Sequence, residues 1–343
     1  MPLACPPRGP SRPCTPEALR RRARTVVLTL QVAATAGSAS AQTVEWVGTR
    51  ALGMAGAFAA VADDASAIYW NPAGLATGPF VSAVVDVTTV GQPGGQGVPA
   101  GGADLEGRGT FAGASTLPVG VAYYRLRSSG AAPGGDGTAR LATLETGHLA
   151  VALVQSLGSS LALGAALKWV HGEAATGVSA APQGAWLEEA QALDREGSDT
   201  FDLDVGVMAT AGRARLALTG RNLRQPSFAA HGGGTVELAR QVRAGLAWRA
   251  GQHVLLAADA DLTRTRTPLG EKRHLAAGVE WQVLPAALAV RGGARASTAG
   301  DATPTGSAGL SAAVSDGLWL DAQLTLGAAG SSSSWSVAGR LAF

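Results

Sequence analysis

From residue 80 to the C-terminus, apolar and polar residues alternate in steps of two along short segments. The final segment, SWSVAGRLAF, places Trp335, Val337 and Leu341 on one face and Ser336 and Arg340 on the other. Strict alternation indicates a β-strand with one apolar and one polar face. The pattern predicts fourteen strands, at about 80–90, 109–115, 119–129, 141–157, 160–174, 200–211, 214–224, 240–250, 253–267, 273–284, 287–298, 305–315, 317–327 and 334–343.

The lengths of these segments and of their connections favour a barrel that crosses a membrane. Most segments have about 10 to 12 residues, the length that a tilted strand needs to cross a bilayer. Short connections, such as 116–118 and 158–160, alternate with longer ones, of which 175–199 is the longest. Tight turns on one rim and longer loops on the other are typical of bacterial outer-membrane barrels, whose turns face the periplasm. We therefore predict an all-β fold, a transmembrane antiparallel β-barrel of about 14 strands formed by residues 80–343.

A soluble β-sandwich is the alternative, because its strands also alternate. A solvated sandwich face would explain the charged residues on the polar faces, but not the alternation of loop lengths together with the export features described below. In a barrel, opposite charges on neighbouring strands would pair around a wet lumen. The expected lumenal pairs are Glu280 with Arg291, Arg243 with Asp259, Asp321 with Arg340, and Asp202 with Arg221.

Tryptophans lie near the ends of the predicted strands. Trp248 and Trp281 fall on apolar faces near the expected periplasmic ends, and Trp169 and Trp335 fall near the outer ends. Aromatic girdles at both interfaces are expected of a membrane barrel. Trp319 falls on a polar face and does not fit this pattern.

Both ends of the chain indicate export to the outer membrane. Arginines within 20–24 precede a short apolar run at 26–36 and an A-x-A cleavage site, so residues 1–41 are expected to hold a signal peptide and the mature chain to start at Gln42. The residues before the arginines are Pro-rich and unlike a signal, which points to a start codon further downstream. At the other end, Phe343 closes an alternating strand and resembles the recognition signal of the outer-membrane barrel assembly machinery.

The composition of the remaining chain excludes several kinds of function. Residues 1–41 hold both cysteines, six of the 27 Lys and Arg and one of the 25 Asp and Glu, which leaves 21 basic and 24 acidic residues. Disulfides and thiolate metal sites are then excluded, and a net charge of −3 does not support a nucleic-acid partner. The five histidines lack metal-binding spacing, and no G-x-S-x-G elbow occurs. We expect no metal, no cofactor and no enzymatic activity.

Residues 42–79 precede the first strand and show no strand alternation. Their many apolar side chains make free exposure to water unfavourable. Asp64 or Ser66 can cap a short helix, and Asn71-Pro72 forms a turn that can lead into the first strand. Lumenal arginines would offer partners to Asp63 and Asp64. We predict that this segment is an N-terminal plug, or hatch, within the lumen.

The stretch GTRALGMAGAFAAVADDASAIYWNPAGL, from Gly48 to Leu75, resembles the N-terminal signature of the FadL superfamily of outer-membrane proteins. That signature has a Gly-Met-Gly-Gly-Ala-Phe core, then Ala-Asp-Asp, then Asn-Pro-Ala-Gly-Leu; this chain departs from it at Ala55, where Gly is usual. In the family, the segment forms a hatch in a fourteen-stranded barrel. The resemblance assigns to the plug motif Gly53, Met54, Gly56, Phe58, Asp63, Asp64, Tyr69, Trp70, Asn71, Pro72, Ala73 and Gly74.

Four further stretches, LTGRNLRQPSF, RQVRAGLAW, LAADADLTR and RHLAAGVEW, are more similar to the PorV/PorQ and TraF-like branch than to the fatty-acid transporters. The resemblance implies passive transport of small hydrophobic compounds across the outer membrane of a Gram-negative bacterium. The alternative is a PorV/PorQ-like accessory barrel that shuttles or anchors secreted proteins without transport of its own. A transporter needs an apolar pocket near the plug, whereas the charged polar faces favour the accessory role. The expected partners are outer-membrane lipid, the barrel assembly machinery, and either a small hydrophobic ligand or a secreted protein.

Overall fold

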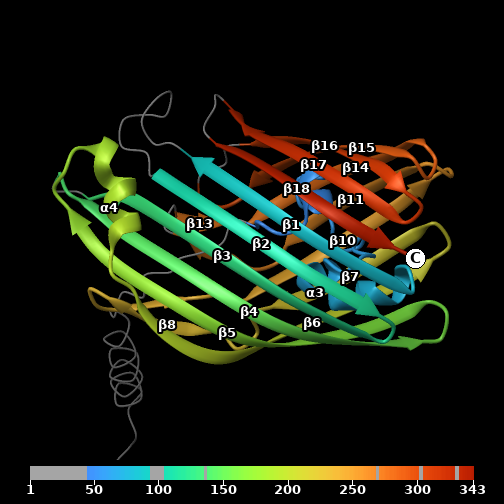
Figure 1. Ribbon diagram of the computed structural model, residues 1–343, viewed down its shortest axis with the longest axis horizontal. Coiled ribbons are helices and arrows are strands. Elements are labelled where there is room, and N and C mark those ends of the chain that lie inside the picture. Colours follow the sequence, from blue (N-terminus) through green and yellow to red (C-terminus); the bar gives the residue numbers. More distant parts are fainter. Residues whose placement is uncertain (1–44, 93–103, 135–136, 268–269, 301–303, 329–331) are drawn as a thin grey trace, which may run out of the picture. The chain divides into compact units, whose positions relative to one another are not determined.

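The computed structural model describes residues 45–92, 104–134, 137–267, 270–300, 304–328 and 332–343, so the predicted signal peptide lies outside the described residues. Within these ranges, fourteen antiparallel strands follow one another around a wall, and β1 pairs with β18 to close it (Figure 1). The predicted barrel of about 14 strands is confirmed. The wall strands are β1 (Val81–Gln92), β2 (Asp104–Thr116), β3 (Val119–Pro133), β4 (Ala139–Leu157), β5 (Leu161–Ser179), β6 (Glu196–Ala211), β7 (Ala214–Arg221), β10 (Gln241–Ala250), β11 (Val254–Asp261), β14 (His274–Leu284), β15 (Leu288–Ser297), β16 (Thr305–Ser315), β17 (Leu318–Gly327) and β18 (Ser333–Ala342).

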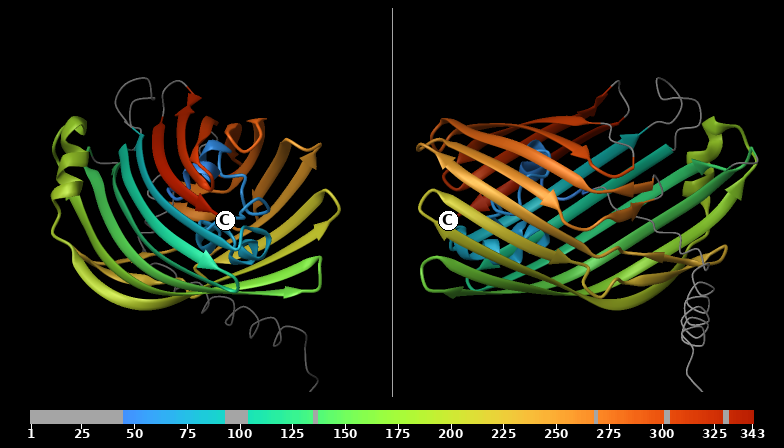
Figure 2. Two further views of the ribbon diagram at one scale, coloured as in Figure 1. Left: turned by 45° about the vertical axis from the view of Figure 1, so that its right-hand side comes forward. Right: turned by 180° about the vertical axis from the view of Figure 1, so that it is seen from behind.

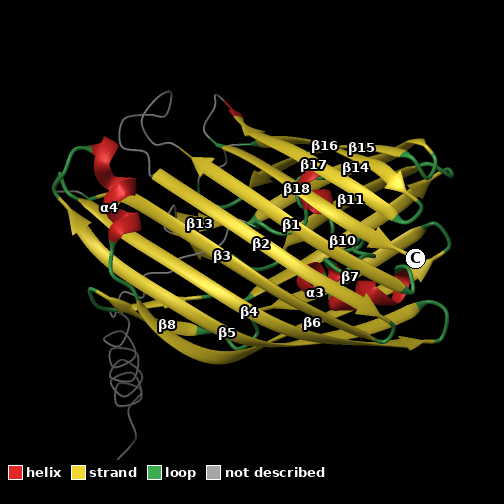
Figure 3. Cartoon of the chain, viewed as in Figure 1, coloured by secondary structure: helices red, strands yellow, loops and turns green. Residues whose placement is uncertain are grey.

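The smaller elements lie before the first strand and in the longer loops (Figure 3). None of the helices in the described ranges is long and apolar enough to cross a membrane. Tight turns join the strands at one rim, and the loops with helices or hairpins lie at the other, which we call the long-loop rim. The smaller elements are α2 (Thr49–Gly53), α3 (Ala67–Trp70), η1 (Pro72–Thr77), η2 (Gln183–Ala185), α4 (Trp186–Ala192), β8 (Ser227–His231), β9 (Thr235–Glu237), β12 (Thr265–Thr267) and β13 (Gly270–Lys272).

Two wall strands are shorter than the alternation predicts. The strand expected at 214–224 ends before Asn222, because Asn222 has a left-handed backbone conformation with a φ of 52° that does not continue a strand. The strand expected at 253–267 ends at Asp261, and its last residues form β12, which pairs with β13 in a separate sheet. Both differences lie at the long-loop rim, where the chain leaves the wall.

The outward face of the wall is apolar, which excludes the sandwich alternative. On β3, Val119, Val121 and Tyr123 are 38%, 48% and 54% exposed, whereas the intervening Ala122 and Tyr124 are buried. A soluble sandwich would show the opposite, with polar residues outside and apolar residues between its sheets. The four tryptophans predicted to form girdles are each about half exposed on the outward face: Trp169, Trp248, Trp281 and Trp335.

Candidate functional site

Residues 45–77, the inner segment, lie inside the barrel and touch opposite sides of its wall. The helix α2 packs against β15, β16 and β17, whereas η1 packs against β4, β5 and β6. Figure 2 shows these elements, in blue, surrounded by the strands. From Glu45 to Leu75, every residue except Arg50 and Asp63 is buried. This burial explains how a segment so rich in apolar residues is accommodated without a strand of its own.

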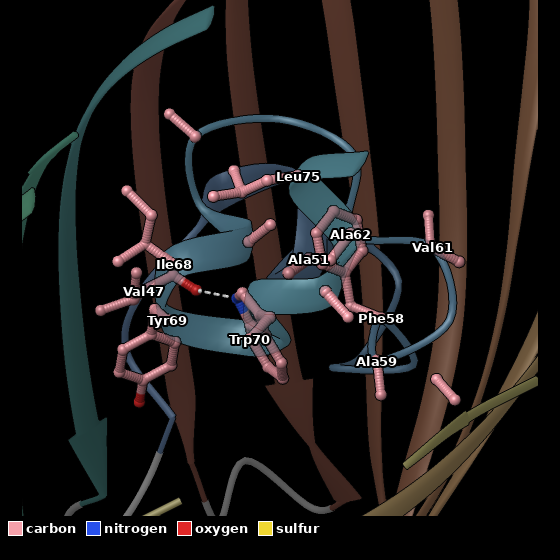
Figure 4. Close-up of a cluster of buried hydrophobic side chains, with 14 of the residues drawn as sticks. Val47, Ala51, Phe58, Ala59, Val61, Ala62, Ile68, Tyr69, Trp70 and Leu75 are labelled. Carbon is pink, nitrogen blue, oxygen red and sulfur yellow. Dashed lines mark hydrogen bonds between the residues drawn. The ribbon is translucent and has the colours of Figure 1, made fainter. Parts of the chain in front are cut away.

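Aromatic rings form the centre of the inner segment. The ring of Trp70 makes edge-to-face contacts with Phe58 and Tyr69, at centroid distances of 5.9 and 5.7 Å. The indole nitrogen of Trp70 donates a hydrogen bond of 3.0 Å to the carbonyl oxygen of Val47, which joins the two ends of the segment (Figure 4). Such pairs contribute about 0.5–1.5 kcal/mol beyond the area that they bury. The segment is therefore a small folded unit with its own core.

Glycines on the inner face of the wall allow backbone to pack directly against backbone. A Cβ atom on Gly164 of β5 would overlap the backbone of Pro72 and Ala73. On the other side of the barrel, a Cβ atom on Gly309 of β16 would lie 3.1 Å from the Cα atom of Gly53. Only glycine permits the approach at Gly164, whereas a side chain at Gly309 would require the neighbouring backbone to shift slightly. The wall is thus shaped to the inner segment at both of its contacts.

Two wall carboxylates bind backbone amides of the inner segment. Asp259 on β11 accepts hydrogen bonds from the amides of Phe58 and Ala59, at 3.0 and 2.8 Å. Asp86 on β1 accepts one of 2.7 Å from the amide of Thr49, and its carboxylate also contacts the Thr49 hydroxyl. A hydrogen bond to a charged group contributes about 1.5–3 kcal/mol, compared with about 0.5–1.5 kcal/mol for a neutral one. These two aspartates fix the segment to well-separated parts of the wall, because five strands lie between β1 and β11.

The motif residues at the end of the inner segment bind one another. The carboxylate of Asp64 accepts a 2.9 Å hydrogen bond from the amide of Ser66, while Ser66, the N-cap residue of α3, makes no side-chain cap bond of its own. The side chain of Asn71 accepts a hydrogen bond from the amide of Ala73 and donates one of 2.9 Å to the carbonyl oxygen of Ala59. The Asn-Pro turn therefore closes on the segment as well as leading out of it.

Ala55 departs from the family signature at a position with an unusual backbone conformation. Its φ is 56°, in the left-handed region, and Gly56 follows with a φ of 83°. Residues with a side chain enter this region at a cost, whereas glycine does not. The left-handed backbone conformation therefore explains why glycine is preferred at this position of the signature.

Arg50 joins the inner segment to a charged network on the wall. Its guanidinium donates two hydrogen bonds to Glu280, at 2.8 and 2.9 Å, and lies 2.5 Å from a carboxylate oxygen of Asp63. Burial by itself lowers the pKa of Arg50, but the charges of Asp63 and Glu280 outweigh it and raise the pKa well above the usual value. Asp63 also lies 3.8 Å from Arg215. The acids of the signature therefore have arginine partners, one within the segment and one on the wall.

Two of the pairs expected from the sequence are in contact. Arg291 donates a 2.6 Å hydrogen bond to Glu280, and Arg340 donates one of 3.1 Å to Asp321. These groups do not face water, because all four side chains are at most 13% exposed and the inner segment covers them. The guanidinium carbon of Arg340 also lies 5.3 Å from the centre of the Trp319 ring, which explains why this tryptophan is on a polar face.

The expected pair of Arg243 with Asp259 is wrong. The register of β10 and β11 places Arg243 opposite Asp261, and the two side chains lie 2.7 Å apart. Asp259 is opposite Gly245, two residues away, and it binds the inner segment instead. Arg243 has a second partner in Glu45, at 2.6 Å. Sequence reasoning missed Glu45 because its arginine partners come from distant strands.

The expected pair of Asp202 with Arg221 is also wrong. Asp202 lies opposite Lys168 on β5, whose ammonium group is 2.7 Å from both Asp202 and Asp204. Arg221 instead stacks on the ring of Tyr69, with its guanidinium carbon 3.7 Å from the ring centre. Lys168 falls on the inward face of an alternating strand, and this parity is the signal that could have revealed it.

Inside the barrel, apolar and aromatic side chains form buried clusters against the inner segment and towards the long-loop rim. Tyr124 stacks on His148 at 4.4 Å and on Phe111 at 6.1 Å, and it meets Tyr69 edge to face at 5.5 Å. Burial raises the pKa of Tyr69, so its phenol stays neutral. Nearer the rim, the β8–β9 hairpin folds against inward-facing residues of β4 and β5. That cluster contains Leu144, Val170, Ala174, Phe228, Ala230, Val236 and Leu238.

No group of three or more His, Cys, Asp or Glu side chains in the described part of the chain could hold a metal ion. The site is therefore one of packing, aromatic surface and ion pairs.

Reversing the charge of Glu280 should destabilise the protein strongly. An arginine at this position would face Arg50 and Arg291, so Glu280→Arg should lower the free energy of unfolding by about 3–5 kcal/mol, as for other broken buried pairs. Exchanging both charges, with Arg291→Glu added, should not restore stability, because the new charges would then face Arg50 and Asp321. Urea unfolding in lipid vesicles measures both effects, with the loss of the heat-modifiable band of the folded protein on unheated gels as the readout.

The exposed pair of Arg264 and Glu271 provides the control. Their side chains are 63% and 41% exposed, so exchanging their charges should change the free energy of unfolding by only about 0–1 kcal/mol. If the double exchange at 280 and 291 restores full stability, the pair acts alone and the network with the inner segment is wrong.

Comparisons with known proteins agree with this architecture. A family model described as "F plasmid transfer operon, TraF, protein" matches residues 139–261, which run from the start of β4 to the end of β11. No curated protein matches the sequence significantly. The family match agrees with the TraF-like part of the sequence resemblance, and the PorV/PorQ part stays a prediction.

Solved structures resemble this chain over most of its length. The monoaromatic hydrocarbon channel CymD has a TM-score of 0.61 and 14% identity, covering 87% of this chain and 98% of the channel. The Ralstonia pickettii toluene transporter TbuX has a TM-score of 0.61 and 13% identity, covering 88% and 99%. A Pseudomonas aeruginosa FadL homologue has a TM-score of 0.63 and 11% identity, covering 89% and 100%. The chain therefore has the fold of FadL-like hydrocarbon channels.

Proposed function

We propose that this protein is an outer-membrane channel through which small hydrophobic compounds cross passively. The observation that carries the proposal is the buried aromatic cluster inside the barrel, where Phe111, Tyr124 and His148 stack beside Tyr69 of the inner segment. Aromatic side chains of this kind would attract an apolar or aromatic molecule that reaches them when the inner segment moves. The apolar cluster beneath the β8–β9 hairpin provides a second contact nearer the long-loop rim. The names of the structural neighbours, a toluene transporter and a monoaromatic hydrocarbon channel, support the same class of substrate.

In this proposal the inner segment is the plug. Its burial, its two carboxylate anchors and its contacts with opposite walls support a segment that closes the lumen. The charged inner faces of the wall were the main argument for an accessory role in secretion. Because several of these charges bind the inner segment, they no longer favour that role. The short turns would face the periplasm and the long loops the exterior, as in other barrels of the outer membrane.

An uptake assay tests the proposed transport. Cells of a Gram-negative host without hydrocarbon channels should take up labelled toluene faster when they express this protein, also after metabolic poisoning, because passive movement needs no energy. Tyr124→Arg should reduce the added uptake several-fold, since a charge would replace the aromatic surface. Tyr124→Phe keeps the ring and should retain uptake. Labelled arabinose is the polar control: equal acceleration of both compounds, or of neither, would show that the barrel is not a hydrophobic channel.

Phe343 is proposed as the assembly signal. Its backbone amide and carbonyl group form hydrogen bonds with Val81 of β1, while its side chain is 63% exposed at the turn rim. Deleting Phe343 should therefore lower the amount of heat-modifiable protein in the outer membrane more than Phe343→Tyr does, since tyrosine keeps an aromatic terminus. Membrane fractionation and band-shift gels measure the amounts. Equal levels for the deletion and the parent protein would contradict the assignment.

A further inference from the structure

The outer surface of the wall contains a groove of about 360 Å³ across β3, β4, β5 and β6. At the end of the groove nearer the short turns, four side chains lie side by side in direct register, and each is about half exposed. These side chains belong to the apolar outward band of the barrel. They are Tyr123, Leu149, Trp169 and Phe201, of which the first three line the groove.

The groove exists because one side chain is missing from the next row towards the long-loop rim. That row consists of Arg125, Gly147, His171 and Asp199, again in direct register. Strands lie about 4.8 Å apart, so the Cα atoms of Arg125 and His171 flank Gly147 at a separation of about 10 Å. A Cβ atom on Gly147 would meet only Tyr123, whose hydroxyl oxygen would lie at 3.4 Å. The gap thus opens outwards at the level where the apolar band ends.

The two sides of the gap carry opposite charges. On one side, the guanidinium of Arg125 is 59% exposed and also contacts Glu145. On the other side, Asp199 accepts a hydrogen bond of 3.0 Å from the indole nitrogen of Trp169 and lies 3.0 Å from a ring nitrogen of His171. Glu173 lies 3.6 Å from the other ring nitrogen of His171. The groove therefore has a cation at one edge, carboxylates at the other, and apolar side chains of the outward band next to both.

A short helix and its loop cover the upper end of the groove. Outward-facing Leu141 on β4 and Ala131 on β3 are buried beneath Trp186 and Ala190 of α4, which lies across these strands near the long-loop rim (Figure 1). Arg195, after this helix, lies 3.7 Å from Glu145 and 3.4 Å from Glu173. Arg195 thus holds the carboxylates of Glu145 and Glu173 in place from the side of the long-loop rim. The apolar side of the groove stays open to the surrounding membrane.

We propose that this groove binds the head group of a zwitterionic membrane phospholipid. The phosphate would lie against Arg125, the primary ammonium against Asp199 and Glu173, and an acyl chain would follow Leu149 and Trp169 along the wall. Arginine binds phosphate through several N–H donors, and an ammonium group has three donors for carboxylates. An anionic lipid lacks the group that the carboxylates would bind. The proposal concerns the outer surface and is independent of transport through the lumen.

Lipid competition measured by native mass spectrometry tests this site. The full-length protein in detergent is incubated with equal amounts of phosphatidylethanolamine and phosphatidylglycerol of the same chain length. Among protein molecules that retain one lipid, those with phosphatidylethanolamine should outnumber those with phosphatidylglycerol by about tenfold. One additional charged hydrogen bond gives a ratio of this size. Phosphatidylcholine, whose ammonium has no N–H group, should compete less well than phosphatidylethanolamine.

Two variants and one control locate the binding. Gly147→Leu fills the groove and should abolish the tenfold preference, and Asp199→Asn removes a carboxylate that would bind the ammonium group and should reduce the preference. Gly306→Leu is the control, because Gly306 also faces outwards near the long-loop rim and has open space around it. Heat-modifiability verifies folding, and Asp199→Asn decides the question if Gly147→Leu does not fold. Equal retention of both lipids by the parent protein, a preference for phosphatidylglycerol, or an unchanged preference in the folded variants would overturn the proposal.

Discussion

Replacing Gly164 with valine is expected to convert a closed barrel into an ion-conducting pore. The new side chain would overlap the backbone of Pro72 and Ala73, which cannot rotate away as a side chain could. Overpacking of a tight interior costs about 1–3 kcal/mol, and displacing the end of the inner segment, the proposed plug, from β5 relieves it. The parent protein in a planar lipid bilayer should show little conductance, and Gly164→Val should show frequent openings. Deleting residues 45–70 should leave a permanently open pore.

A matched glycine shows whether position or substitution causes the effect. Gly339 on β18 faces outwards with open space around it, so Gly339→Val adds an apolar side chain towards lipid and should stay closed. Protease digestion gives an independent measure, because a displaced plug should be cut within residues 45–77 only in the Gly164 variant. If Gly164→Val folds and conducts no more than the parent, close backbone packing does not hold the plug.

Placing arginine at Leu310 should cost about 2–4 kcal/mol in the free energy of unfolding, as for a charge near the middle of the bilayer. Leu310 lies in the middle of β16, is 45% exposed, and has Val290 and Ala322 as its neighbours across the strands. The outward face offers no partner for a charge at this depth. Urea titrations of Leu310→Arg in lipid vesicles measure the loss.

The same strand provides the control for this prediction. Val314 also faces outwards and is 59% exposed, but it lies next to the short turn between β16 and β17. Near an interface the long arginine side chain reaches water, so Val314→Arg should cost only about 0–1 kcal/mol. Equal losses at the two positions would mean that β16 does not cross the membrane as we describe, and that the membrane boundaries lie elsewhere on the wall.

The wall of the barrel is largely determined by local sequence. Alternation of apolar and polar residues is a property of neighbouring positions, so strands such as β3 and β18 can be recognised without knowing what they pair with. The same alternation identifies the inward face, and with it the burial of Glu280, Arg291, Asp321 and Arg340. Strand ends are less certain from sequence, because a single backbone conformation, as at Asn222, ends the strand early.

Ion pairing depends on register, which the sequence leaves open. Arg243 has acids at two inward positions of the next strand, Asp259 and Asp261, and only the pairing of β10 with β11 selects the second. The carboxylate that remains then binds amides of the inner segment. Glu45 lies between arginines of several strands, a position that no local pattern predicts.

The sequence by itself determined the class of fold and the number of strands, and it predicted a plug in the segment that lies inside the barrel. Only the tertiary structure decided what the glycines do. Gly164 permits the backbone of the inner segment to approach β5, and Gly147 opens a groove between Arg125 and His171. A glycine in an alternating strand looks the same in either case, because its role depends on what lies opposite it. Strand pairing and closure of the barrel bring those partners together from distant parts of the sequence. Local sequence patterns therefore cannot predict which residues will face each glycine.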